Sequence, residues 1–559
     1  MHVSIVTGTF NRLPLLQSMV ASARGQFPRH IQFEFVVVDG GSTDGTLEWL
    51  ETQPDVRLIR HGGLKGAIRA FCDGAAQARG EYVLMANDDI QFRPYSIMRA
   101  LCYLEETRTC GGVAFADDRG QQLGHGKGHR VERMPAIDPD GKPTALVYAQ
   151  VGLFRRWIGE LVGWWGANDE HMRNARTYGG DNYLSARIWE LGYSIDAVDG
   201  CAIDDVLPDD QLRQHNRGIS QNDSAQYYGR FPRGPYTRAV PQVPNAQKER
   251  LRAVLMDIHE PRLPARTAKE AGLAEALSEV SLLWHIDYVN DTYDLPAVIG
   301  AWRPHILIVQ MHDTSRIDAH VLRAAREQNP EMVIVNWNGD AHHKGLTSPD
   351  VIEALHEVDL QTTINLAVQP TYDREGIQSA YWQIGYKEPA APYPGTVPAH
   401  EILWQGNCYD ERRLQLVARL RSMGFDVGVY GSCPEADGNT HYDFGHQAAL
   451  YQAATVVIGD TFPGTIGFVS NRLFQALGAG AFLLQEHSDR LDELTGLTAG
   501  EHYIQWHDLD DLQDKVRHWM NPGMTAERLR IALNGREFVR KNFSYPAQVR
   551  KLWSLLPQD

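Results

Sequence analysis

The sequence has no apolar run long enough to cross a membrane, and it has few cysteines. No stretch approaches the ~18–20 apolar residues of a membrane-spanning helix, and the N-terminal MHVSIVTGTF has neither a charged leader segment nor a cleavage site. No two cysteines form a C-x-x-C pair, as expected for reduced thiols in a cytoplasmic protein. The six are Cys72, Cys102, Cys110, Cys201, Cys408 and Cys433. We therefore expect a soluble cytoplasmic protein with reduced cysteines and no stable membrane insertion.

Positive charge is also scarce. The chain has 54 lysines and arginines against 70 acidic residues, and its formal net charge is −16. This balance argues against a protein coated in positive charge for nonspecific nucleic-acid binding, although a local basic groove remains compatible with it. Internal repeats and low-complexity tracts are absent as well. With 43% hydrophobic residues and roughly 100–200 residues per domain, the 559-residue chain is expected to form three folding units.

The first 230 residues alternate short β-branched runs with helical patterns, which predicts a parallel sheet covered by helices. Strands are expected at 3–10, 33–41, 56–61 and 81–89, and helices at 13–24, 43–53, 66–79 and 95–106. A proline-rich stretch follows at 231–249 and is predicted to be a linker between a domain at 1–230 and the rest of the chain.

A second α/β region follows, and a proline-rich break at 388–398 divides it. Strands are expected at 252–259, 304–313 and 331–340 before the break, and at 401–407, 425–432, 454–460 and 481–486 after it. This pattern predicts two Rossmann-like lobes, at 250–395 and 396–559, with a cleft between them.

Three of the predicted N-terminal strands end in polar segments, and ligands of open parallel sheets bind at such strand ends. The segments are 7–12, 39–46 and 87–89. The middle one, DGGSTDGT, is also compatible with a turn and a helix cap, and Asn-Asp-Asp alone with a loop. Their order favours a nucleotide-sugar site, because a departing diphosphate needs a divalent cation, and hard cations prefer carboxylate oxygens.

Four motifs resemble family 2 glycosyltransferases of the GT-A fold over about residues 2–220: SIVTGTFNR, VVVDGGSTDGT, ARGEYVLMANDDI and GGDNYLSARIWELGY. The resemblance implies that Asp39 contacts the base of a nucleoside-diphosphate sugar. It also implies that 87–89 is a D-x-D-type motif, with Asp89 the firmest metal and ribose contact, and that Asp181 is the general base. The chain departs from the family pattern at Asn87 and Gly180, where acidic residues are usual.

The predicted ligands of the N-terminal domain are therefore a donor of UDP, GDP or dTDP type and a Mn²⁺ or Mg²⁺ ion. The donor-binding candidates are Thr7, Thr9, Asn11, Arg12, Asp39, Gly40, Lys65, Asn87 and Asp88, and the metal candidates are Asp88, Asp89 and His215. A solvated loop histidine is an equal alternative for His215.

The residues themselves also favour Asp181 as a base. It follows two glycines and opens an amphipathic helix, although aspartate is common at helix N-caps for structural reasons too. An acceptor hydroxyl has a pKa far above 7, so attack on the sugar requires a carboxylate within hydrogen-bond reach. A single base without a covalent nucleophile inverts the anomeric centre. Trp164 and Trp165 are compatible with stacking on an acceptor sugar and equally with core packing.

The C-terminal region has a different set of polar residues. The stretch GDTFPGTIGFVSNRLFQALGAGAFLLQE contains a glycine-rich loop and a predicted helix start near Ser470 and Asn471, with Arg472 beside it. A helix N-terminus with an arginine suits a diphosphate. No acidic triplet is present, and a transferase that stabilises its leaving group in this way needs no metal. We expect no cofactor here.

Residues 400–545 resemble the C-terminal half of GT-B glycosyltransferases, in particular the spore-maturation group with its SNRLFQALGAGAFLL-like signature, and 250–395 would be the acceptor half. The resemblance implies that Arg412 or Arg413 faces the donor phosphates, together with Ser470, Asn471 and Arg472. Gln475 stands where many relatives have the glutamate that holds the donor ribose. For the base we choose Asp340 over His312, and we interpret His342 and His343 as exposed loop residues rather than metal ligands.

Three functional hypotheses follow. The first is a bifunctional glycosyltransferase that adds sugars to a bacterial or phage glycan. The second keeps the chemistry but acts on modified bases of phage DNA, for which basic stretches such as RHGGLKGAIR and GHGKGHRVER would line a groove. The third is a GT-A enzyme with a non-catalytic GT-B module that binds glycan.

Overall fold

The chain folds into two compact units in a computed structural model. The first unit comprises Met1–Leu251 with Ala297–Arg303, and the second Arg252–Pro296 with Pro304–Asp559. The structure describes residues 2–28, 31–122, 128–217, 219–231, 236–239, 250–257, 268–287, 291–311, 314–337, 348–383, 385–389, 393–408, 410–434, 436–438, 443–462, 465–468 and 470–556. Among these residues, none of the helices is both long and apolar enough to span a membrane.

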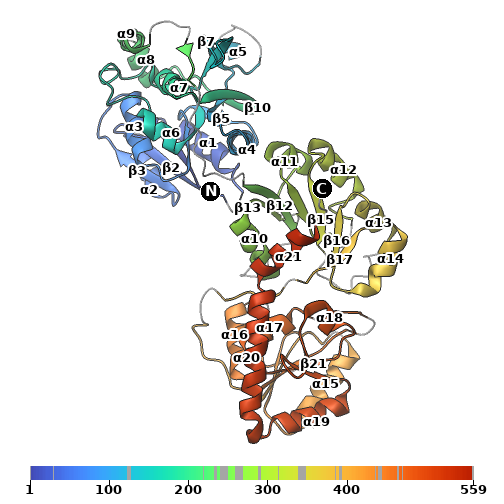
Figure 1. Ribbon diagram of the computed structural model, residues 1–559. Helices are drawn as coiled ribbons and strands as arrows, with labels where there is room; N and C mark the ends of the chain where they lie inside the picture. Colours follow the sequence, from blue (N-terminus) through green and yellow to red (C-terminus); the bar gives the residue numbers. More distant parts are fainter. Residues whose placement is uncertain are drawn as a thin grey trace. The chain divides into compact units, whose positions relative to one another are not determined.

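The first unit is built on an eight-stranded sheet in the order β3-β2-β1-β4-β9-β6-β10-β5 (Figure 1). Its strands are β1 (His2–Thr9), β2 (Gln32–Asp39), β3 (Val56–Arg60), β4 (Tyr82–Met85), β5 (Ile90–Phe92), β6 (Cys110–Ala116), β9 (Gly152–Arg155) and β10 (Ser194–Asp205). The four strands predicted from the sequence are β1 to β4, which pair in parallel. Strands β1, β2 and β4 form because their β-branched and aromatic residues are buried on both faces of the sheet, whereas β3 is a half-buried edge strand.

The sheet is not parallel throughout, in contrast to the prediction. Strand β9 runs antiparallel to both of its neighbours, β4 and β6, and β5 runs antiparallel to β10. A small second sheet has the order β11-β7-β8. Its strands are β7 (Glu132–Ile137), β8 (Pro143–Tyr148) and β11 (Tyr236–Thr237). Because β11 pairs with β7, this part of the expected linker belongs to the first unit.

Helices of the first unit connect the strands and cover the sheet. They are α1 (Leu13–Arg24), α2 (Thr46–Glu51), α3 (Ala67–Gln77), α4 (Ser96–Glu106), α5 (Arg119–Gln122), α6 (Arg156–Val162), α7 (Gly180–Glu190), α8 (Gln211–Arg217) and α9 (Ser220–Arg230). Helix α3 packs on β1 and β2, and α4 packs on β6 and β10. Trp164 and Trp165 are each 5% exposed and lie in the hydrophobic core, where Trp165 stacks on Phe71. The structure therefore favours core packing for both tryptophans.

The second unit contains two further sheets. The first has the order β13-β12-β14-β15-β16-β17 and consists of β12 (Leu251–Asp257), β13 (Ser281–Asp287), β14 (Ile306–Val309), β15 (Val333–Trp337), β16 (Leu360–Thr363) and β17 (Ser379–Tyr381). The second has the order β19-β18-β20-β21-β22 and consists of β18 (Ile402–Gln405), β19 (Val427–Tyr430), β20 (Val456–Gly459), β21 (Leu483–Glu486) and β22 (Ile504–Trp506). The neighbouring strands from β12 and β14 to β17, and those of the second sheet, pair in parallel, which confirms the two Rossmann-like lobes.

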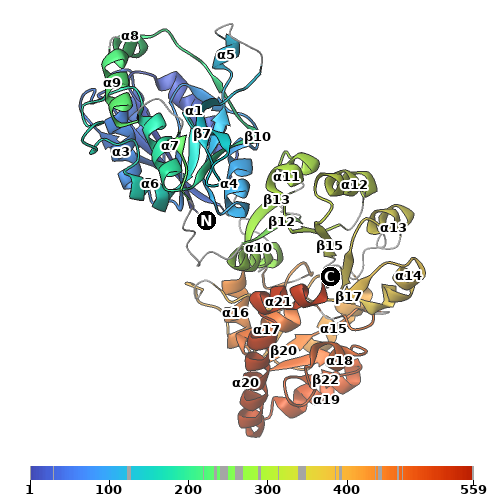
Figure 2. The ribbon, with the colours of Figure 1, turned by 45° about the horizontal axis from the view of Figure 1, so that its top comes forward.

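Helices follow the strands in both lobes. The first lobe has α10 (Ala268–Val280), α12 (Ala319–Gln328), α13 (Pro349–Leu355) and α14 (Gln369–Arg374), while most of α11 (Leu295–Trp302) lies in the segment Ala297–Arg303 of the first unit. The second has α15 (Glu411–Arg421), α16 (Phe444–Ala453), α17 (Arg472–Ala479), α18 (Leu491–Thr495), α19 (Leu509–Trp519) and α20 (Thr525–Asn542). The last helix, α21 (Tyr545–Leu555), packs against α10 (Figure 2) and contributes to the core of the first lobe.

One disulfide bond joins Cys408 to Cys433, so the expectation of reduced thiols is wrong for this pair. The two cysteines follow β18 and β19, which are neighbours in the sheet. Their Cα atoms are 4.8 Å apart, close to the ~4.8 Å spacing between paired strands. The two cysteines are 25 residues apart in the sequence, so no short motif indicated that they pair. The tertiary fold brings them together. Cys72, Cys102, Cys110 and Cys201 form no disulfide bond.

Candidate active site

A cavity of about 360 Å³ lies in the first unit, where β1 and β4 end. Seven of the predicted donor or metal residues line it: Thr9, Arg12, Gly40, Lys65, Asn87, Asp88 and Asp89. Sequence reasoning missed several other lining residues that come from later in the chain, including Arg119, Arg176, Thr177, Arg213 and Asn216. Helix α8 and Ile219, which precedes α9, supply part of this later wall. The position at the strand ends agrees with where open parallel sheets bind ligands.

Two predicted donor residues organise the turn after β2. The carboxylate of Asp39 is 1% exposed and accepts the backbone N–H groups of Gly41 at 2.7 Å and Ser42 at 3.0 Å. The amide oxygen of Asn11 accepts the N–H of Thr43 at 2.7 Å, and its own N–H donates to the Ser42 hydroxyl at 2.9 Å. Asn11 has a positive φ of 51°, a conformation that asparagine tolerates. These contacts fix the shape of the turn that borders the cavity at Gly40.

Thr7 is fully buried in β1, and its hydroxyl donates to the Gly8 carbonyl oxygen at 3.4 Å. It is not among the residues that line the cavity.

A network of aspartates and arginines forms one wall of the cavity. Arg12 is 8% exposed, and its Nη1 donates to Asp88 at 2.8 Å and to Asp89 at 3.1 Å. Its Nε donates to Asp210 at 2.6 Å, and Arg213 contacts Asp89 at 3.2 Å. Burial alone would lower the pKa of Arg12, but the carboxylates around it raise that pKa above its usual value. The carboxylates of Asp88 and Asp89 are therefore held by cationic side chains.

Asp205 extends this network at the end of β10. Arg119 lies 3.4 Å from its carboxylate and Arg213 lies 3.8 Å away. Burial, together with the nearby Asp89, raises the pKa of Asp205 to about 6, although Arg119 opposes the shift. The acidic run 204–210 was the sequence signal that could have identified this part of the site.

One buried oxygen in the network has no hydrogen-bond partner. Oδ2 of Asp88 is inaccessible to solvent and receives no donor from the described residues. Burial raises the pKa of Asp88 to about 6; Arg12 opposes this shift and Asp89 adds to it. An unsatisfied buried carboxylate oxygen is costly, and a hard divalent cation prefers such ligands. The residues therefore fit a divalent metal ion. His215 belongs to α8, but its side chain lies outside the described part of the structure.

The cavity is rich in positive charge. Arg12, Lys65, Arg119, Arg176 and Arg213 line it, against the carboxylates of Asp88 and Asp89. An excess of cationic side chains in a partly enclosed space favours a polyanion such as a diphosphate.

Asp181 lies in the first turn of α7, as its sequence position predicted. The N-cap is Gly179, with a φ of 89°, so Asp181 is not the capping residue. Its Oδ1 accepts the N–H of Asn182 at 2.9 Å. Burial of the carboxyl group raises the pKa of Asp181 to about 6; the Asn182 N–H opposes the shift, Glu132 adds to it and Arg119 opposes it. A pKa near neutrality is suited to a general base.

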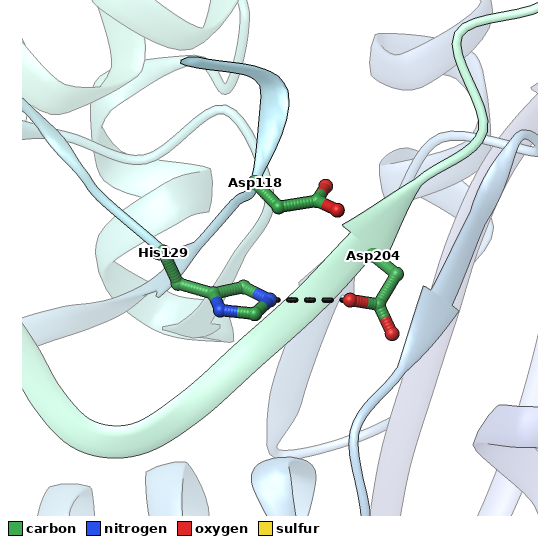
Figure 3. Close-up of side chains that lie close together, drawn as sticks. All are labelled: Asp118, His129 and Asp204. Atoms are coloured by element: carbon green, nitrogen blue, oxygen red, sulfur yellow. Dashed lines mark hydrogen bonds and ion pairs between the residues drawn. The ribbon is translucent and has the colours of Figure 1, made fainter. Parts of the chain in front are cut away.

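A second cluster lies beside the cavity wall and consists of Asp118, His129 and Asp204 (Figure 3). One ligand-type atom from each residue lies within 4.8 Å of the others. His129 Nε2 is 3.2 Å from Asp204, and Asp118 accepts the N–H of Asp205 at 2.9 Å. Arg93 pairs with Asp204 at 2.7 Å. Because each group already has a protein partner, we do not assign a metal to this cluster.

The candidate donor site of the second unit is almost filled by protein atoms. A pocket of only about 10 Å³ is lined by Asp460, Ser470 and Arg472, among others. Helix α17 begins at Arg472, where the sequence predicted a helix start after Ser470 and Asn471. Arg472, Arg413 and Arg412 contact Asp460 at 3.4, 2.6 and 3.5 Å. The three arginines thus share one carboxylate that is 2% exposed.

Further predicted residues of this half are placed as follows. Arg412 also pairs with Glu486 at 2.7 Å. Gln475 is 4% exposed, and its Nε2 donates to the Gly385 carbonyl oxygen at 3.0 Å, so its amide bridges to the segment after β17. The base candidates Asp340 and His312, and the loop residues His342 and His343, lie outside the described residues.

Two family models match the chain. Residues 4–156 match glycosyl transferase family 2, and residues 412–554 match a glycosyl transferase-like family. No curated protein matches the sequence.

Several solved structures are similar to parts of the chain. A mannosyltransferase from Pyrobaculum calidifontis, in complex with GDP-Man and Mn²⁺, is 20% identical over 42% of this chain and 64% of its own, with a TM-score of 0.31. This chain therefore spans less than two thirds of that protein. Residues 1–349 of S. aureus TarS are 17% identical over 42% and 73%, with a TM-score of 0.29. Sucrose-phosphate synthase from Thermosynechococcus elongatus is 12% identical over 55% and 98%, with a TM-score of 0.39.

Both family models describe glycosyltransferases, and each falls on the unit whose sheet topology suits it. The chain therefore contains two regions that match glycosyltransferase families, one in the first unit with its mixed sheet and one in the second lobe of the second unit with its parallel sheet.

Proposed function

We propose that the chain is a glycosyltransferase and that its N-terminal domain, residues 1–230, performs a metal-dependent transfer that inverts the anomeric centre of a nucleotide sugar. The observation that carries the proposal is the buried Oδ2 of Asp88, which lacks a donor among the described residues. Asp88 belongs to the family 2 match and lines a basic cavity. Asp88 and Asp89 would hold Mn²⁺ or Mg²⁺, with His215 as a third candidate. When bound, the ion would neutralise charge on the diphosphate leaving group.

The chain's own residues would bind and orient the donor. The diphosphate lies among Arg12, Lys65 and the arginines of the later wall, because these cations line the same cavity. Asp39 holds the turn that contains Gly40, and this turn forms the nucleoside end of the site. The donor is a UDP, GDP or dTDP sugar.

Asp181 acts as the general base. An acceptor hydroxyl donates a hydrogen bond to its carboxylate, and the hydroxyl oxygen attacks the anomeric carbon from the face opposite the diphosphate. The hydroxyl proton passes to Asp181, while the bond from the anomeric carbon to the diphosphate oxygen breaks and its electron pair leaves with the diphosphate. One displacement without a covalent nucleophile inverts the anomeric configuration.

The C-terminal region, with lobes at 250–395 and 396–559 after a linker at 231–249, performs a second transfer in this proposal. Arg412, Arg472 and the start of α17 supply its diphosphate site, and Asp340 supplies its base. The acceptor of the whole enzyme is a bacterial or phage glycan. A base in modified DNA is the alternative acceptor, and a non-catalytic glycan-binding role is the alternative for the GT-B-like region.

The metal requirement is tested on the full chain. Hydrolysis of UDP-glucose, UDP-N-acetylglucosamine and GDP-mannose is followed by nucleotide release, with Mn²⁺ or with excess EDTA. We expect EDTA and Asp89→Asn each to reduce hydrolysis of the active donor at least about 100-fold, as expected for the loss of a charge-stabilising group. Asp55→Asn, at the amino end of β3 and far from the strand ends that form the cavity, is the matched control. Full hydrolysis in EDTA would contradict the assignment of Asp88 and Asp89.

A further inference from the structure

One buried carboxylate oxygen of Asp223, in α9, accepts four hydrogen bonds. Its side chain is 2% exposed, and Oδ2 accepts the backbone N–H groups of Arg176 at 3.1 Å, Thr177 at 2.7 Å and Tyr178 at 3.1 Å. The hydroxyl of Thr177 donates to the same oxygen at 3.0 Å. Hydrogen bonds to an ionised carboxylate are short and roughly twice as strong as neutral ones. The carboxylate therefore fixes the backbone of three consecutive residues.

These three residues connect the cavity to the candidate base. Arg176 and Thr177 line the cavity. After Tyr178 the chain passes through Gly179 into α7, whose first turn contains Asp181. A displacement of the segment would therefore move both a wall of the donor cavity and the start of the helix that presents the base.

Helices α3 and α9 both contact this segment. The carbonyl oxygen of Arg176 accepts the N–H of Ile68 in α3 at 3.0 Å. Gly66, with a φ of +93°, permits this approach, because an added Cβ would lie 2.6 Å from the same carbonyl oxygen. A Cβ added to Gly179 would lie 3.1 Å from Tyr227 of α9. The segment is thus closely packed, and Asp223 provides the charged contact in that packing.

We propose that Asp223 is a positioning residue for the transfer reaction: it holds residues 176–178 so that the Asp181 carboxylate reaches the acceptor hydroxyl at the edge of the donor cavity. This inference rests on the proposed function, because it requires Asp181 to be the base. Asp223 touches neither substrate nor metal, and it acts through the backbone that it anchors. Its effect should be large, because a misplacement of about 1 Å at a reacting group can cost about 10²-fold in rate.

The test compares full-length variants in the nucleotide-release assay at 20 °C, with UDP binding and thermal unfolding measured on the same samples. We expect Asp223→Ala to lower kcat about 10- to 100-fold and to weaken UDP binding by no more than about threefold, since most of the cavity wall is unchanged. Asp223→Asn keeps an amide oxygen that can accept the same N–H groups, and it should restore part of the lost kcat. A folding defect alone would lower the folded fraction seen in thermal unfolding, but it would leave the kcat of the folded protein unchanged.

Two further variants separate the claims. Asp55→Ala removes a two-contact ion pair with Arg24, at 2.8 and 2.9 Å, at the amino end of β3 and away from the strand ends that border the cavity, and it should leave kcat unchanged. Asp181→Asn tests the base itself, so activity in that variant would refute the proposed function independently of Asp223. The positioning role is refuted if Asp223→Ala, folded at 20 °C, retains a kcat within twofold of that of Asp55→Ala. It is equally refuted if UDP binding and kcat fall by the same factor.

Discussion

The two candidate donor sites of this chain differ in how their charges are balanced. In the N-terminal domain a cavity of about 360 Å³ contains a buried carboxylate oxygen of Asp88 that lacks a donor among the described residues. In the C-terminal lobe the pocket is about 10 Å³, and Arg412, Arg413 and Arg472 already contact Asp460. The first site has space for a ligand and a buried carboxylate oxygen without a described donor. In the second site, the arginines that would bind a diphosphate are already paired with a protein carboxylate.

This difference has a consequence for the donor of each site. A diphosphate that binds the C-terminal arginines must compete with Asp460 and with Glu486, which pairs with Arg412 at 2.7 Å. Separating a buried ion pair leaves charges without partners and is unfavourable. The N-terminal arginines are also paired with carboxylates. In the proposed metal-bound site, a divalent cation would bind these carboxylates, and the guanidinium groups would then be able to contact the diphosphate. We therefore expect the N-terminal site to bind UDP or GDP more tightly.

The largest expected effect separates the two sites by activity. Asp181→Asn keeps the shape of the side chain but removes the base, so donor hydrolysis by the N-terminal domain should fall about 10²- to 10⁴-fold, with UDP affinity within threefold of the wild type. Arg472→Ala should leave this hydrolysis unchanged, because Arg472 belongs to the C-terminal lobe. Nucleotide release with the donor that the wild type hydrolyses measures both. A fully active Asp181→Asn variant would show that Asp181 is not the base. Loss of hydrolysis in Arg472→Ala would show that the measured reaction belongs to the C-terminal lobe.

The next effect concerns stability and is confined to the C-terminal lobe. Asp460→Asn leaves three guanidinium groups around a neutral side chain, and we expect a loss of about 3 kcal/mol, the lower end for breaking a buried pair, or roughly 6–12 °C in Tm. Asp426→Asn is the control, because Asp426 is 61% exposed and pairs with His400 at the surface, where such pairs contribute about 0–1 kcal/mol. Thermal unfolding in low and high salt measures both. Equal Tm values for the two variants would mean that Asp460 does not hold the arginines together.

The same substitution should also reduce the difference in diphosphate binding between the two sites. With Asp460 neutral, the arginines lose the carboxylate with which a diphosphate competes, so Asp460→Asn should be stabilised more strongly by pyrophosphate or UDP than the wild type is. The N-terminal variant Asp89→Asn, measured in parallel, identifies the share of the shift that comes from the first site.

Much of the fold could be predicted from the sequence because the relevant signals are local. Strands β1, β2 and β4 are buried on both faces, and such strands read as continuous apolar runs. The helix start near Ser470 and Asn471 was predicted for the same reason, and α17 begins at Arg472. The antiparallel β9 between β4 and β6 was missed, because four residues carry no pattern that specifies their direction.

The parts of the site that were missed depend on contacts between distant residues. Asp210 reaches Arg12 across 198 positions, and Arg213 reaches Asp89 across 124. A single sequence gives no indication of such pairs, and the same holds for Asp223 with Thr177. The disulfide between Cys408 and Cys433 follows this rule, because the order of β18 and β19 in the sheet places the two cysteines together.

The smallest effect is the pH dependence of the N-terminal reaction, and it tests whether burial has tuned the base. Burial raises the pKa of Asp181 to about 6, above the value of ≈ 3.9 for an unperturbed aspartate. The base works only as the carboxylate, so activity should be full above about pH 7 and should fall about tenfold per pH unit below the pKa. At pH 5 the expected rate is about one tenth of the plateau, and an unperturbed aspartate would retain about nine tenths.

Glu132→Gln removes the acidic neighbour that adds to the shift in the pKa of Asp181, so the acid limb of this variant should move to lower pH while the plateau is kept. An acid limb near pH 4 in the wild type would show that Asp181, if it is the base, is solvated in the working enzyme, and the structural contrast between the two sites would then rest on the metal carboxylates alone.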